Sequence, residues 1–172
     1  LTARLLGYWR FNDFAAAHLL QHPPRGFDID GIGDGFAETL LQLLAADGEV
    51  EATAGRHVDV AAVHEAALID AAFQRVARAP LREPFRPSAA DASRLASSRF
   101  VLSAGVALLS EHWPLSERRL GFAEHQNDAS FELGEPASEA SHWLLARHQT
   151  KPGLKLGLLR LEPTEAKLLQ LL

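Results

Sequence analysis

The sequence contains no cysteine and no methionine. The absence of cysteine excludes disulfide bonds, thiolate metal ligands and cysteine nucleophiles from this chain. It also fits a reducing compartment, where disulfides are rare. Because translation starts with methionine, the absence of that residue leads us to expect that the natural N-terminus precedes Leu1.

Long hydrophobic runs are missing as well. No apolar run approaches the roughly 18 to 20 residues that are needed to span a bilayer, and the first residues do not resemble a signal peptide. We therefore expect a cytoplasmic protein that makes no membrane contact.

The chain also lacks an excess of positive charge. It carries 17 Lys and Arg against 22 Asp and Glu, which gives a formal net charge of −5. Affinity for nucleic acid depends on contacts between basic side chains and phosphates. The composition predicts no nucleic-acid partner, and it counts against the alternative function of a DNA-binding transcriptional regulator.

What is present is typical of a globular protein: 172 residues, 47% hydrophobic and 23% charged. This length is sufficient for one core, or for two small subdomains that share one. We predict an α+β fold, with a helical N-terminal half and a small C-terminal antiparallel sheet closed by a short helix. The expected divisions are a helical domain at 1–80, a proline-rich linker at 81–97 and a β-rich domain at 98–172.

Three helices are expected in the first half. The first covers Phe14 to Gln21, with Asn12 or Asp13 as its cap, and Pro23–Pro24 end it. Asp34 is expected to cap the second, whose apolar stripe is Phe36, Leu40, Leu43 and Leu44. The third covers Val60 to Ala79, with an inward set (Val63, Ala67, Val76) and an outward set (Glu65, Asp70, Arg75).

Strands are expected in the second half, at 99–109, at 129–136 and in a terminal hairpin. The hairpin consists of HWLLARHQ, the turn TKPG and LKLGLLRL, followed by the helix EPTEAKLLQLL. An exposed sheet edge can bind an extended peptide as an additional strand. The candidate edges are Ser130–Gly134, Trp143–Gln149 and Leu154–Leu161. The candidate peptide-binding residues are Trp143, Leu145, Arg147, Leu156 and Leu158; alternatively, Trp143 and Leu145 belong to the core and Arg147 is solvated.

Catalytic and metal-binding patterns are weak. His18 and His22 share a helix face, but no third ligand is placed by the sequence. A calcium loop that starts at Asp28 has Thr39 where a closing Glu is required. Glu65 and His64 could form an acid–base pair, but adjacent helix residues point about 100° apart, so we expect both side chains to be solvated. We predict no catalytic residue, no metal ligand and no cofactor on this chain, and a stand-alone hydrolase or metalloenzyme is the remaining alternative.

Four segments in this order resemble the MbnC/HvfC-like family: 18–44 (HLLQHPPRGFDIDGIGDGFAETLLQLL), 58–85 (VDVAAVHEAALIDAAFQRVARAPLREPF), 99–115 (RFVLSAGVALLSEHWPL) and 142–172. The resemblance covers nearly the whole chain. It implies a non-catalytic subunit that binds an MbnB-like TIM-barrel iron oxygenase, which carries the iron. It also implies a role in binding the leader of an MbnA-like ribosomal precursor peptide, whose cysteines are converted to oxazolone–thioamide groups in methanobactin-type biosynthesis.

The surface for the oxygenase is expected around the linker and the Trp-Pro corner, at Phe85, Trp113 and Pro114. Trp113 has an alternative role as an anchor between the two halves of the chain. Tyr8 and Trp9 are further candidates, since Tyr and Trp are enriched at interface hot spots.

Overall fold

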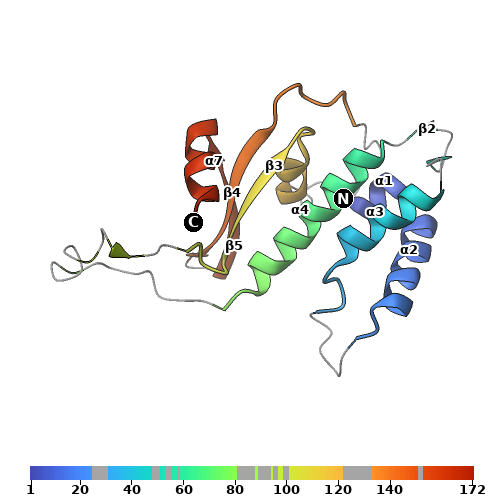
Figure 1. Ribbon diagram of the computed structural model, residues 1–172, viewed down its shortest axis with the longest axis horizontal. Coiled ribbons are helices and arrows are strands. Elements are labelled where there is room, and N and C mark those ends of the chain that lie inside the picture. Colours follow the sequence, from blue (N-terminus) through green and yellow to red (C-terminus); the bar gives the residue numbers. More distant parts are fainter. Residues whose placement is uncertain are drawn as a thin grey trace.

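The structure is a computed structural model that describes residues 1–24, 31–47, 51–52, 56–57, 59–80, 88, 94, 97–98, 101–121, 133–150 and 153–172. Figure 1 shows helices α1 to α4 on one side of a small sheet and helix α7 on its other side. The predicted α+β fold is therefore confirmed: a helical N-terminal half is followed by a three-stranded antiparallel sheet and a short closing helix.

The first two helices are α1 (Thr2–Leu6) and α2 (Tyr8–Gln21), with Gly7 between them at φ 79°. This positive φ is accessible to glycine without strain and lets the chain turn between the two helices. The expected helix start after Asn12 or Asp13 is wrong, because both residues lie inside α2.

The third helix, α3 (Phe36–Asp47), follows a turn that ends at Gly35, which has φ 76°. Gly35 directly precedes the helix, so the expected cap at Asp34 is also wrong. The predicted apolar stripe is correct in part: Leu40 and Leu44 are fully buried, whereas Phe36 and Leu43 are partly buried against the core.

The longest helix, α4 (Val60–Arg78), agrees with the prediction to within one residue. Asp59 caps its N-terminus, because the Asp59 carboxylate accepts a hydrogen bond from the Ala61 amide at 2.7 Å. The inward side is confirmed, since the predicted set Val63, Ala67 and Val76 is buried. Between α3 and α4 lies a two-stranded ladder of β1 (Glu51–Ala52) and β2 (Arg56–His57).

The main sheet contains β3 (Val106–Glu111), β4 (Ser141–Thr150) and β5 (Gly153–Leu161) in that spatial order. Both pairings are antiparallel, and the predicted terminal hairpin forms β4 and β5. Helix α6 (Leu115–Leu120) follows β3, and α7 (Pro163–Gln170) ends the described chain.

Helix α7 begins where the sequence predicts it. The Glu162 and Glu165 side chains form a capping box, and Pro163 occupies the first turn. Two strand predictions need correction. The strand expected at 99–109 begins only at Val106, after a turn, and the described residues 133–136 of the strand expected at 129–136 are not in a strand.

One core joins the two halves of the chain. Helix α4 lies against β3 and β4, and α7 contacts all three strands. The buried cluster includes Leu40 and Ile69 from the helices together with Leu109 and Leu145 from the sheet. The domain divisions that the sequence suggests remain a prediction, and most of the expected linker 81–97 lies outside the described residues. Within the described part of the chain, no helix has the length and apolar character of a membrane span.

Candidate functional site

Strand β3 has one free edge. The Arg147 amide donates to the Gly105 carbonyl at 3.1 Å. Along an antiparallel pair of strands, hydrogen-bonded residue pairs alternate with pairs that are not hydrogen-bonded, so Ala107 and Leu109 also form hydrogen bonds with β4. The backbone N–H and C=O groups of Leu108 and Ser110 consequently point away from β4. No described strand pairs with this side of β3, so it can accept an additional strand.

A groove of about 640 Å³ runs along this free edge. Its floor is the exposed side of α4, one wall is the start of α3, and the other wall is β3. The lining includes Glu38 from α3, Leu68, Ala72 and Arg75 from α4, and Leu108 and Ser110 from β3. The groove combines apolar surface, charged side chains and outward-pointing backbone groups, which is the combination that an extended peptide requires.

Helix α4 runs beside β3 over its whole length. At one end, Glu65 accepts hydrogen bonds from the amides of His112 at 2.6 Å and Trp113 at 3.1 Å. At the other end, a Cβ placed on Gly105 would lie 3.9 Å from the Cβ of Ala79. Helix α4 therefore lies alongside β3 from the Trp-Pro corner at one end to Gly105 at the other.

The five side chains predicted to bind a peptide share one face of the sheet, but α4 covers this face. Trp143 and Leu145 are 8% and 0% exposed and belong to the core, as in the alternative interpretation. Leu156 and Leu158 are half-buried against the same core. Their placement does not support contact with a peptide.

Arg147 has a structural role in this face. Its Nη1 donates to the carbonyl of Ala77 at 2.7 Å and also to the carbonyl of Ala79. These are among the last carbonyls of α4, which have no partner within the helix. Arg147 therefore ties the terminal hairpin to the end of α4 and is not available to bind a peptide.

The candidate edges also change. Trp143–Gln149 is not an edge, because β4 lies between β3 and β5. Leu154–Leu161 does belong to an edge strand, β5. Of Ser130–Gly134 only the last two residues are described, and they are not in a strand. The edge beside the groove, on β3, was not among the candidates.

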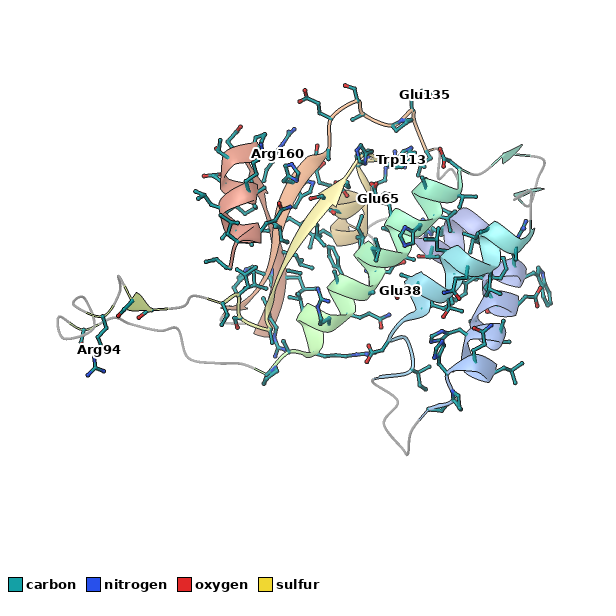
Figure 2. All side chains as sticks on the ribbon, in the orientation of Figure 1. Glu38, Glu65, Arg94, Trp113, Glu135 and Arg160 are labelled. Atoms are coloured by element: carbon teal, nitrogen blue, oxygen red, sulfur yellow. The ribbon has the colours of Figure 1, made fainter. Side chains whose placement is uncertain are left out.

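The Trp-Pro corner anchors the two halves of the molecule. Trp113 is only 5% exposed, and Figure 2 shows it beside Glu65, whose carboxylate binds its amide. Pro114 is exposed, and Phe85 lies outside the described residues. The anchor role of Trp113 is confirmed, and its burial leaves little surface for a partner.

Two carboxylates expected to face solvent instead make long-range contacts. Glu65 binds the backbone of the Trp-Pro corner, and its Oε2 lies 3.3 Å from Nδ1 of His112. Asp70 accepts hydrogen bonds from the Thr2 hydroxyl at 2.9 Å and from Arg119 Nε at 2.7 Å. Asp70 thus joins α4 to α1 and α6. Helical periodicity alone gave no signal for either contact.

Glu111, at the end of β3, is a third carboxylate that the sequence did not single out. It is 1% exposed, and its Oε2 accepts hydrogen bonds from the amide and the hydroxyl of Ser116, both at 2.7 Å. Burial raises the pKa of Glu111 above its ordinary value, by more than the Ser116 hydrogen bonds lower it, and the nearby charge of Glu65 adds to the rise.

The described residues contain no group of three or more histidine or acidic side chains that could hold a metal ion. Nδ1 of His18 lies 2.9 Å from the Thr39 hydroxyl, which itself donates to the Gly35 carbonyl. The Thr39 oxygen must therefore accept from His18, whose Nδ1 carries the proton. His18 therefore links α2 to α3. Asp28, the first position of the calcium loop considered above, lies outside the described residues.

Exposed aromatic side chains occur at the start of α2. Tyr8 is 70% exposed and Trp9 is 83% exposed. Tyrosine and tryptophan with this exposure are typical of surfaces that bind another protein. They replace Trp113 as the aromatic candidates for a partner contact.

Comparisons of the chain with protein-family models, with curated proteins and with solved structures find no match.

Proposed function

We propose that this chain is the non-catalytic partner of an MbnB-like iron oxygenase and binds an extended segment of a ribosomal precursor peptide. Cysteines of that MbnA-like peptide are the groups to be modified, and the iron belongs to the oxygenase. The observation that carries the peptide-binding part is the free edge of β3 beside the groove. The oxygenase part rests on the family resemblance of the sequence.

Strand addition fits the groove for two reasons. The outward N–H and C=O groups of Leu108 and Ser110 can pair with a peptide backbone, which gives affinity that is independent of sequence. The side chains of Leu68 and Arg75 on the floor can then contact two of the peptide side chains that point inward, which occupy every second position of the strand.

A proline scan of the two free edges tests the peptide-binding part. In Leu108→Pro the proline removes an N–H that points into the groove. The hydrogen bonds to β4 are made by the neighbouring residues Ala107 and Leu109, so the substitution leaves them in place. Arg160→Pro is the matched control, because the Arg160 amide points away from β4 at the free edge of β5. The probe is a short peptide of alternating threonine and alanine, titrated into the ¹⁵N-labelled protein.

We expect Leu108→Pro to abolish the peptide-induced shifts and Arg160→Pro to retain them. The reverse result would move the site to β5. Shifts that survive both substitutions, or no shifts in the parent protein, would exclude strand addition. Circular dichroism of each variant establishes that it is folded.

Co-expression with the oxygenase tests the second part. We expect a stable 1:1 complex on size exclusion, with iron confined to the large subunit, and weaker association for Trp9→Ala. Separate elution of the two proteins, or stoichiometric iron on the small chain alone, would contradict the proposal.

A further inference from the structure

We infer that the groove beside β3 selects an extended segment with an apolar residue and an acidic residue four positions apart, which contact Leu68 and Arg75. The inference rests on the proposed strand addition and adds the side-chain chemistry of the bound segment. It follows from the way in which α4 and β3 are aligned.

The alignment has two fixed points, Glu65 beside His112–Trp113 and Ala79 beside Gly105. Between them α4 advances about 21 Å at 1.5 Å per residue. Over the same interval β3 advances about 24 Å at 3.4 Å per residue. Helix and strand therefore run antiparallel and cover almost the same length between the two points, with about two helix residues for each strand residue.

This ratio of about two helix residues to one strand residue places each residue of the groove floor beside a definite position of β3. Interpolation between the two points puts Arg75 level with Ala107, Ala71 and Ala72 level with Leu109, and Leu68 between Ser110 and Glu111. The side chains of Ala107 and Leu109 point toward α4, where they are buried. Directly opposite residues in neighbouring strands point to the same face. A peptide residue opposite Ala107 therefore points toward Arg75, and the next inward residue points toward the two alanines.

Three inward positions of the bound segment follow. The first contacts Leu68, which is 44% exposed; the second lies over Ala71 and Ala72; the third meets the exposed guanidinium of Arg75. First and third positions are four residues apart, about 13.6 Å in a strand. Leu68 and Arg75 are separated by about 10.5 Å along the axis of α4. The long arginine side chain spans the remaining distance to the third position of the peptide.

The charges around the groove assign the acidic residue to this third position. Asp34 and Glu38 are exposed on the α3 wall, and Glu65 and Arg78 of α4 also line the groove. Arg75 is on the floor, where the inward side chains point. A carboxylate at the third position pairs with Arg75, whereas a lysine there meets a like charge.

The test compares two probes on the complete chain by fluorescence anisotropy. The first is fluorescein-labelled Thr-Leu-Thr-Ala-Thr-Glu-Thr, and the second has lysine in place of glutamate. Both are also made in reverse order, because a strand can add in either direction. We expect the glutamate probe in one direction to bind on the order of fivefold to tenfold more tightly than its lysine counterpart, and Arg75→Glu to reverse this preference.

Lys155→Glu is the matched control, since it changes the net charge equally from an exposed position on β5. It should leave the preference unchanged. Equal affinity for the two probes, with binding still abolished by Leu108→Pro, would overturn this inference and leave strand addition intact. A preference that responds equally to Arg75→Glu and Lys155→Glu would show an effect of net charge only and would also overturn it. Absence of binding by every probe would overturn both proposals.

Discussion

Replacement of Glu65 by alanine should destabilise the protein more than any other single change at an acidic residue of the groove. The Glu65 carboxylate is 13% exposed and accepts two backbone hydrogen bonds, from His112 and Trp113, in addition to its contact with the His112 ring. A hydrogen bond to a charged group contributes about 1.5 to 3 kcal/mol. Because the His112 contact is solvent-exposed, we expect a total loss of about 2 to 3 kcal/mol.

The assay is urea unfolding followed by tryptophan fluorescence, which reports on the buried Trp113 and Trp143 together with the exposed Trp9. Glu65→Gln retains one oxygen that can accept from both amides but removes the charge, and it should lose about half as much stability. Glu38→Ala is the control, since Glu38 is exposed on the α3 wall and should change the unfolding free energy by less than about 0.5 kcal/mol. Equal effects of Glu65→Ala and Glu38→Ala would refute the anchoring role of Glu65.

Three further predictions concern the remaining polar contacts. Arg147→Ala should lower the unfolding free energy by about 2 kcal/mol in urea titrations, because two carbonyls at the end of α4 lose their donor, whereas Lys155→Ala should have little effect. Glu111 has a folded pKa above its ordinary value of 4.5, so its ionisation destabilises the protein as pH rises through that folded pKa. Glu111→Gln should therefore gain stability relative to the parent as the pH rises from below 4.5 through the folded pKa of Glu111, and a stability difference that is independent of pH would exclude this effect. Thr39→Val should cost about 1 to 2 kcal/mol, measured by thermal unfolding, because it leaves Nδ1 of the buried His18 without its acceptor.

The parts of the fold that could be predicted depend on local signals. Helix α4 has a capping aspartate and a regular apolar stripe, and α7 follows a capping-box pattern with a proline in its first turn. The β4–β5 hairpin pairs Thr150 with Gly153, which are only three positions apart in the sequence. Each of these features is encoded within a few neighbouring residues.

The candidate site depends on contacts between distant parts of the sequence. The central position of β4 follows from its pairing with β3, which precedes it by about thirty residues, and hydrophobic periodicity does not reveal which strand lies in the middle. From the sequence alone Glu65 is interpreted as a solvated helix residue, because its hydrogen-bond partners are 47 and 48 residues away in the chain. Arg147 alternates correctly with Trp143 and Leu145, but only the structure shows that α4 covers this face.

Hydrogen exchange at the individual amides of β3 tests strand addition most directly. With the threonine–alanine peptide bound, we expect slower exchange at Leu108 and Ser110, whose amides point into the groove. Exchange at Ala107 and Leu109, whose amides already pair with β4, should change little in comparison. Slower exchange at Leu156 and Leu158 on β5, with no change at Leu108 and Ser110, would exclude strand addition at β3.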